Sequence, residues 1–136
     1  MRYRSSITPH GLPMGEVYAD LKLTNPFTKE SASVRALVDT GASHLIVPAE
    51  LARVLGFDVE ELVVSNVTIA DGRRIPVPRI EALRVDFEDR HCTLDVVVLG
   101  DQCLMGFIPL ECMDLIVDPR KQCLIGAHPG GPVFRV

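Results

Sequence analysis

One short run of residues constrains this chain more than any other. Residues 39–43 read Asp-Thr-Gly-Ala-Ser, and they lie between the apolar runs Ala-Leu-Val at 36–38 and Leu-Ile-Val at 45–47. An acidic side chain is rarely kept among apolar residues unless it is paired or used in chemistry. Gly41 has no Cβ, so backbone N–H groups can approach the Asp39 carboxylate. The pattern predicts a reactive carboxylate on a tight turn between two buried strands.

A second motif makes this signal more specific. An Asp-Thr-Gly triplet alone is expected by chance in roughly one chain in forty of this length. Here the triplet continues as Ala-Ser, and residues 103–108 later read Cys-Leu-Met-Gly-Phe-Ile. Together these motifs resemble those of the retroviral-type aspartic proteases (retropepsins) and their small prokaryotic relatives, in which an apolar-apolar-Gly turn and a short helix close the domain. The resemblance extends over about residues 15–118.

Length and charge narrow the function classes. A chain of 136 residues suits one domain, with a core at about 15–126, an N-terminal extension at 1–14 and a tail at 127–136. The net charge of −4 comes from scattered residues and forms no basic stripe, so we expect no nucleic-acid partner. No apolar run is long enough for a membrane span, and residues 1–14 lack the apolar region of a secretory signal. We therefore expect a cytoplasmic protein without a membrane partner.

The four cysteines indicate structural thiols. They are widely spaced among apolar neighbours, which favours reduced core cysteines over disulfides. Neither a Cys-x-x-Cys motif nor a histidine pair at helical spacing is present, so we expect no metal site and no cofactor. His91 and Cys92 are adjacent, but neighbours along a strand point to opposite faces, which argues against a thiol nucleophile.

Periodicity and turn signals predict a mainly β domain with many short strands. Strands are expected at 15–24, 33–38, 45–47, 62–69, 75–87, 91–99, 115–117 and 122–125, and helices at 48–55 and 109–113. Asp71-Gly72 lies between two apolar runs and predicts a hairpin turn. Many strands with little helix favour a closed or folded β-barrel with one or two short helices, which is the retropepsin-like fold class.

The chemistry requires more than one carboxylate. A single ionised aspartate can act as a base, but it cannot also donate a proton. Asp39 is the one aspartate in an Asp-Thr/Ser-Gly context, so the second carboxylate is expected from another copy of the chain, in a two-fold homodimer. The leading hypothesis is an aspartic endopeptidase that cleaves extended peptides or unfolded proteins.

The resemblance also implies roles for the neighbouring residues. Thr40 would cross the dimer axis and, with Gly41, support the two aspartates. Ala42 and Ser43 would lie beside the substrate, and residues 104–106, ending at Gly106, would pack beneath the catalytic turn. The hairpin at Asp71 and Gly72 would form the flap, which folds over the peptide and binds it as an added strand.

Each of these positions also has a simpler interpretation. Thr40 and Ser43 are common in turns, Gly106 is compatible with an ordinary turn, and His44 with a structural histidine at a strand start.

Two departures from the retroviral pattern affect the dimer. Retroviral enzymes typically pair an Asp after Asp-Thr-Gly-Ala with an Arg after the second-motif Gly, and here these positions are Ser43 and Phe107. Dimer contacts are therefore expected elsewhere, from residues 133–136 or from apolar packing near Phe107. The flap has one glycine beside Asp71, Arg73 and Arg74. These departures leave open a second hypothesis, a non-catalytic peptide-binding or dimerisation module with the same fold.

Overall fold

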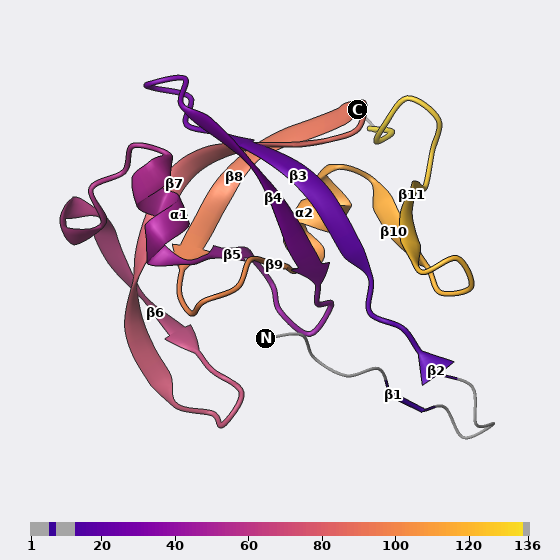
Figure 1. Cartoon of the computed structure of the whole chain (residues 1–136), viewed down its shortest axis with the longest axis horizontal. Helices are drawn as coiled ribbons and strands as arrows, with labels where there is room; N and C mark the ends of the chain where they lie inside the picture. The colour runs from indigo at the N-terminus through magenta and orange to yellow at the C-terminus, as the bar shows by residue number, and fades with distance from the viewer. Residues whose placement is uncertain (1–5, 8–12, 135–136) are drawn as a thin grey trace.

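A small β-barrel forms the centre of the molecule (Figure 1). The computed structural model describes residues 6–7 and 13–134. The central sheet contains β3 (Tyr18–Thr24), β4 (Ser31–Val38), β5 (Leu45–Val47), β6 (Val63–Thr68), β7 (Arg74–Phe87), β8 (Arg90–Val98) and β9 (Leu104–Met105). Two antiparallel pairs lie outside it: β1 (Ser6–Ile7) with β2 (Pro13–Met14), and β10 (Leu115–Asp118) with β11 (Cys123–Gly126).

The sheet closes on itself. Its strand order is β3-β4-β9-β5-β8-β7-β6, and β3 also pairs with β7 through Leu23 and Val85 and their neighbours. Six strands therefore form a ring, and β6 extends beyond it along the outer edge of β7. The fold is mainly β with two short helices and is retropepsin-like, which confirms the fold class expected from the sequence.

The inward-facing positions follow the predicted alternation. On β3, Ala19, Leu21 and Leu23 are buried, and the residues between them face outward or are half-buried. On β8, the successive residues Val96–Val98 are all buried: Val96 and Val98 belong to the core cluster, and Val97, which points to the opposite face, is buried as well. The prediction that this valine run is buried on both faces is confirmed.

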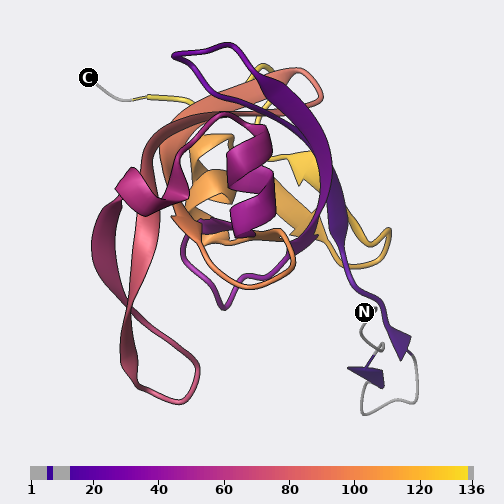
Figure 2. The same ribbon diagram turned by 60° about the vertical axis from the view of Figure 1, so that its left-hand side comes forward.

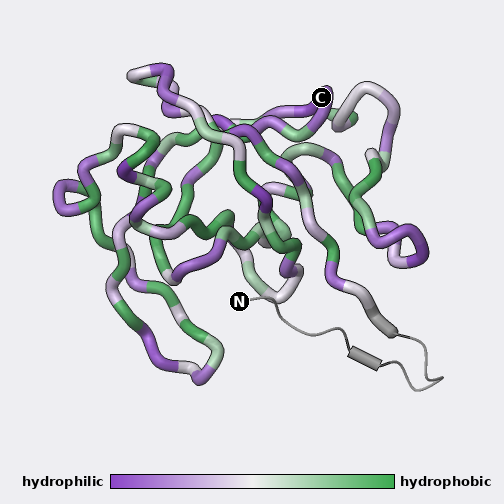
Figure 3. The backbone as a smooth tube through the Cα atoms, in the orientation of Figure 1, coloured by the Kyte–Doolittle hydropathy of each residue, from purple (hydrophilic) through white to green (hydrophobic). Residues whose placement is uncertain are grey.

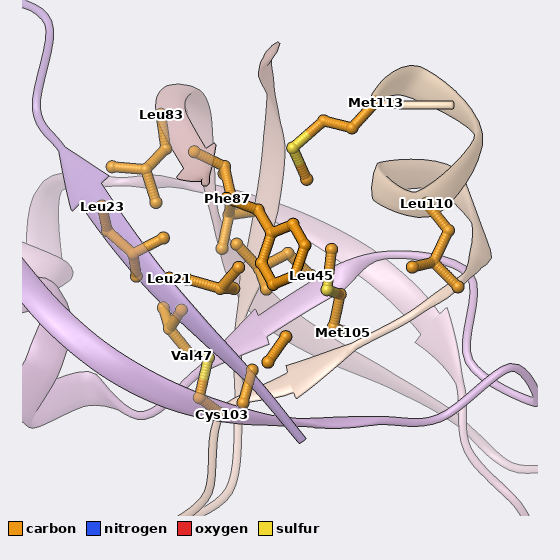
Figure 4. Packing of buried hydrophobic residues seen from close by; sticks show 14 of the residues in the cluster. Leu21, Leu23, Leu45, Val47, Leu83, Phe87, Cys103, Met105, Leu110 and Met113 are labelled. Carbon is orange, nitrogen blue, oxygen red and sulfur yellow. The ribbon is translucent and has the colours of Figure 1, made fainter. Parts of the chain in front are cut away.

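One core fills the barrel. Figure 4 shows Leu110, from the second helix, and Met113, the residue directly after that helix, on the side of the core where Phe87 and Met105 lie. In Figure 3 the hydrophilic colour is concentrated in turns such as the one between β10 and β11. Burial of a large apolar side chain contributes about 1.5–3 kcal/mol, so this cluster supplies most of the driving force for closing the ring.

Both helices are short and lie where the sequence predicted helical turns. Helix α1 (Ala49–Val54) follows Pro48 and ends before Gly56, whose φ of 87° suits glycine. Figure 2 shows α1 at one end of the ring. Helix α2 (Phe107–Cys112) begins two residues earlier than expected. Within the described part of the chain, no helix is long and apolar enough to cross a membrane.

Some elements differ from the prediction. Strand β4 begins at Ser31, the 3₁₀ helix η1 (Val59–Glu61) was not expected, and β9 was interpreted as part of a turn. All four cysteines are free, as expected, but Cys103 alone is buried, Cys92 and Cys123 are half-buried and Cys112 is exposed, so the prediction that all four are core residues is wrong. In the tail, Val133 and Phe134 are exposed and form no strand, so this part of the predicted dimer contact is not a strand in the single chain. Residues 135–136, and residues 1–5 and 8–12 of the N-terminal extension, lie outside the described residues.

Candidate active site

Asp39 lies on a tight turn that leaves the end of β4. Its backbone N–H donates to the Met105 carbonyl oxygen at 2.9 Å, and its own carbonyl oxygen accepts from the Ala42 N–H at 3.1 Å. The Gly41 N–H donates to Asp39 Oδ1 at 3.0 Å, as the sequence suggested. The side chain is half-buried rather than enclosed, so one side of the carboxylate faces open space.

The segment after β9 supports this turn from below. The N–H groups of Gly106, Phe107 and Ile108 donate to the carbonyl oxygens of His44, Ala42 and Ser43 at 3.0, 3.0 and 2.9 Å. Three successive backbone hydrogen bonds therefore tie residues 106–108 to residues 42–44. We call residues 39–44 and 105–108 together the floor of the site.

Gly106 is required by close contact between backbones. A Cβ at this position would lie 2.5 Å from the Ala42 carbonyl oxygen, 2.6 Å from the Ser43 carbonyl carbon and 2.7 Å from the His44 carbonyl oxygen. Its φ of −81° is ordinary, so space and not conformation selects glycine here. Gly106 therefore packs directly against the backbone of the turn that carries Asp39.

A hollow of about 700 Å³ opens above the floor. Its walls are mainly apolar, and Asp39 and His44 are the ionisable side chains among them. The lining consists of Asp39, Gly41, Ala42, Ser43, His44, Ile46, Val67, Thr68, Ile69, Ala70, Val97, Leu99, Leu104 and Phe107. A carboxylate at the wall of an apolar groove of this size suits the binding of an extended polymer.

The β6–β7 hairpin forms the roof of the hollow. Its turn is closed by hydrogen bonds from the Ile69 N–H to the Arg73 carbonyl oxygen and from the Gly72 N–H to the Ile69 carbonyl oxygen, both 2.9 Å. Gly72 has a φ of 88°, which is typical of the glycine in a three-residue hairpin loop. Asp71 accepts from the Arg73 N–H at 2.9 Å and from Arg73 Nε at 2.7 Å, and these bonds lower the pKa of Asp71.

A second hollow of about 590 Å³ lies on the other side of Asp39, and we call it the Glu16 hollow. It is lined by Gly15, Glu16, Val17, Leu37, Val38, Asp39, Thr40, Gln102, Leu104 and Val117. Oε2 of Glu16 is buried and has no hydrogen-bond partner among the described residues. None of the described residues that line this hollow is Lys or Arg, and its acidic residues are Glu16 and Asp39.

The structure brings some of the predicted site residues together and separates others. Asp39, Gly41, Ala42 and Ser43 share the larger hollow, Thr40 lines the Glu16 hollow, and Gly106 lies beneath the turn. Asp71 and Gly72 lie at the tip of the β6–β7 hairpin, the predicted flap, and are not among the lining residues. Their contact with substrate, like that of Gly106, stays a prediction.

Sequence reasoning missed residues that the folded chain adds to the site. Residues 67–70 of the flap and Phe107 line the larger hollow, and Glu16 lines the smaller one. The position of residues 67–70 directly before the Asp71-Gly72 turn was the available signal for the flap. Nothing local marked Glu16, because its place beside Asp39 depends on the pairing of Val17 with Val38.

Two of the cysteine thiols lack the lowered pKa that a nucleophile needs. Burial, with smaller contributions from Cys112 and Asp86, raises the pKa of Cys92 to about 12, so this thiol is protonated at neutral pH. Burial likewise raises the pKa of Cys103 to about 12. Within the described ranges no group of three His, Cys, Asp or Glu side chains is arranged to hold a metal ion.

Comparison with known proteins assigns the family. Residues 27–111, which contain the Asp39 turn, the β6–β7 hairpin and β9 with most of α2, match the family model described as "gag-polyprotein putative aspartyl protease". The chain belongs to this retropepsin-like aspartyl protease family. No curated protein sequence matches it significantly.

One solved structure has the same fold as this chain. The crystal structure of a retropepsin-like aspartic protease from Rickettsia conorii matches with a TM-score of 0.61 and 23% sequence identity. The match covers 86% of this chain and 91% of that chain. At this identity the likeness shows the shared fold.

Proposed function

We propose that this retropepsin-like protein is an aspartic endopeptidase whose active form is a two-fold homodimer with one Asp39 from each copy. The observation that carries the proposal is the half-buried Asp39 carboxylate at the wall of an apolar hollow, with the flap strand opposite it. Each chain carries a single Asp-Thr-Gly sequence, so a second copy supplies the second carboxylate.

Two facing carboxylates share one proton, because both cannot be ionised cheaply at short range. The ionised Asp39 takes a proton from a water molecule as that water attacks the scissile carbonyl carbon. The protonated Asp39 donates its proton to the carbonyl oxygen, which gives a tetrahedral diol. The Asp39 that took the water proton then gives it to the leaving nitrogen, and the other Asp39 takes a proton from a diol hydroxyl as the C–N bond breaks. The Gly41 N–H, which donates to Oδ1, holds the carboxylate in position.

The walls favour an extended peptide with apolar side chains near the cleaved bond. Ile46, Val97 and Leu99 supply apolar surface on one side, and residues 67–70 supply an exposed edge of backbone on the other. A peptide lying between them would bind as an additional strand, which uses backbone hydrogen bonds that every sequence offers.

The decisive test compares Asp39→Asn with Asp89→Asn on a library of unfolded peptides. Asp89 is exposed in the turn between β7 and β8, far along the chain from the site, so its change is a matched control for charge. We expect Asp39→Asn to lower kcat/KM by on the order of a thousandfold while Asp89→Asn leaves it unchanged, since general acid–base catalysis contributes factors of this size. Cleavage that survives Asp39→Asn would overturn the proposal.

The same assay distinguishes the alternative, a non-catalytic peptide-binding module. That function predicts tight binding of extended peptides by the wild-type chain with no cleavage at any protein concentration. Cleavage whose specific rate rises with protein concentration in the range where the dimer forms would instead favour the enzyme, because the site is assembled from two copies.

A further inference from the structure

The unpartnered Glu16 carboxylate oxygen indicates that the single chain is incomplete on the Thr40 side of Asp39. A buried hydrogen-bonding group without a partner costs about 1–3 kcal/mol, and more when it is charged. Glu16 Oε2 is a buried acceptor of this kind. The polar side chains of Thr40 and Gln102 line the same hollow, but neither donates a hydrogen bond to it. Something that donates a hydrogen bond is therefore expected to enter the Glu16 hollow.

The position of the hollow identifies what enters it, given the proposed dimer. The two hollows meet at Asp39 and Leu104 and otherwise have different walls. Figures 1 and 2 show the flap on one side of the catalytic turn and the segment leading into β3, which carries Glu16, on the other. A two-fold axis beside Asp39 then places the Glu16 hollow towards the second copy, against the near edge of that copy's larger hollow.

That edge carries a suitable donor. Ser43 Oγ lies 2.7 Å from His44 Nδ1. In the tautomer in which the Ser43 hydroxyl donates to Nδ1, the ring proton is on Nε2. Nε2 of His44 has no hydrogen-bond partner in the described part of the chain, and His44 lines the larger hollow. Among the described residues that line the two hollows, it is the one ring N–H donor.

We propose that Glu16 of each copy accepts a hydrogen bond from His44 of the second copy, so that two equivalent contacts flank the Asp39 pair. This inference rests on the proposed homodimer and assigns positioning roles to Glu16 and His44. It also gives the dimer a polar contact at the position where Ser43 and Phe107 replace the retroviral ion pair. Ser43 then acts through His44, because its hydroxyl sets the tautomer.

The test measures the dimer dissociation constant by analytical ultracentrifugation for wild type, Glu16→Ala and His44→Ala. Each variant dimer loses two of these contacts. We expect each single variant to raise Kd by about tenfold, and by no more than about thirtyfold. Asp20→Asn, on the outward face of β3, is the matched control and should leave Kd unchanged.

Mixing the two single variants gives a sharper result. A heterodimer of Glu16→Ala and His44→Ala chains keeps one intact contact, between Glu16 of one chain and His44 of the other, whereas each variant homodimer keeps none. We expect the heterodimer to be tighter than either variant homodimer, by about threefold or more. A contact within one chain cannot produce this rescue, so equal affinities for the three dimers would overturn the inference.

The outcomes also separate this inference from the proposed enzyme. If wild type dimerises and cleaves peptides but Kd is unaffected by both substitutions, the Glu16–His44 contact is wrong and the endopeptidase stands. If Glu16→Ala leaves Kd unchanged and lowers kcat/KM specifically for peptides with a basic side chain, the hollow binds substrate and the inference is overturned. If wild type stays monomeric at every concentration, both the Glu16–His44 contact and the proposed pair of Asp39 carboxylates are wrong.

Discussion

The floor and the roof of the active site are built in opposite ways. The floor consists of two backbone segments in contact, tied by hydrogen bonds between residues 42–44 and 106–108, above the fully buried Met105. The roof is a hairpin in which every residue of β6 is exposed or half-buried and Val77 is the buried residue of the facing part of β7, and a Cβ added at Gly72 would meet nothing within 4 Å. Segments with few buried contacts open at low free energy, so the flap can move while the carboxylate stays in place.

The base of the roof is fixed more firmly than its tip. Arg79, on β7, donates from Nε to Ser65 Oγ on β6 at 2.9 Å and from Nη1 to Asp95 Oδ2 on β8 at 2.7 Å. Beyond this point β7 pairs with β8 and β3 and buries Leu83 and Val85. One strand therefore supplies both part of the barrel wall and half of the flap.

Substitution of the floor glycine should have the largest effect. In Gly106→Ala the new methyl group would collide with backbone atoms of residues 42–44, which cannot move without shifting the catalytic turn. We expect a loss of about 2–3 kcal/mol in the free energy of unfolding, measured by urea denaturation, and a large drop in peptide cleavage. Faster hydrogen exchange at the Phe107 and Ile108 amides should accompany it. A stable variant with unchanged exchange would contradict the rigid floor.

The matched change in the roof should be milder. In Gly72→Ala the methyl group has space, so its cost comes from the φ of 88°, which L-residues adopt at about 1 kcal/mol. We expect a correspondingly small fall in the urea midpoint, with hydrogen exchange at Phe107 and Ile108 unchanged. If Gly72→Ala destabilised the chain as much as Gly106→Ala, the contrast between roof and floor would be wrong.

The smallest effect is expected at the flap tip. The Arg73 N–H, followed by the Arg73 side chain, lowers the pKa of Asp71 from its ordinary value near 3.8. The stabilisation of the hairpin turn by ionised Asp71 is therefore fully present above about pH 4, and it disappears as the pH falls through the lowered pKa of Asp71. We expect wild type to exceed Asp71→Asn slightly in hairpin protection at pH 7, and the two to converge below pH 4, measured by NMR of the Arg73 amide. A difference that grew on acidification would contradict this sign.

Much of the barrel was predictable because local patterns encode it. Alternating burial on β3, the valine run on β8 and the glycine after α1 each depend on neighbours in the chain, and the structure confirms them. Strand β9 was missed because its two residues are held by partners far away in sequence, β4 on one side and β5 on the other. A pair of residues has no periodicity from which a strand could be recognised.

The sequence by itself identified the Asp39 carboxylate, the turn that carries it and the family to which the chain belongs. Asp39, Gly41 and Gly106 act through local backbone geometry and close approach, and such requirements leave a readable motif. Tertiary structure alone decided that residues 67–70 face Asp39 and that Glu16 reaches its other side without a partner. Those placements follow from closing the ring between β3 and β7 and from the pairing of Val17 with Val38, and contacts between distant segments leave no local pattern.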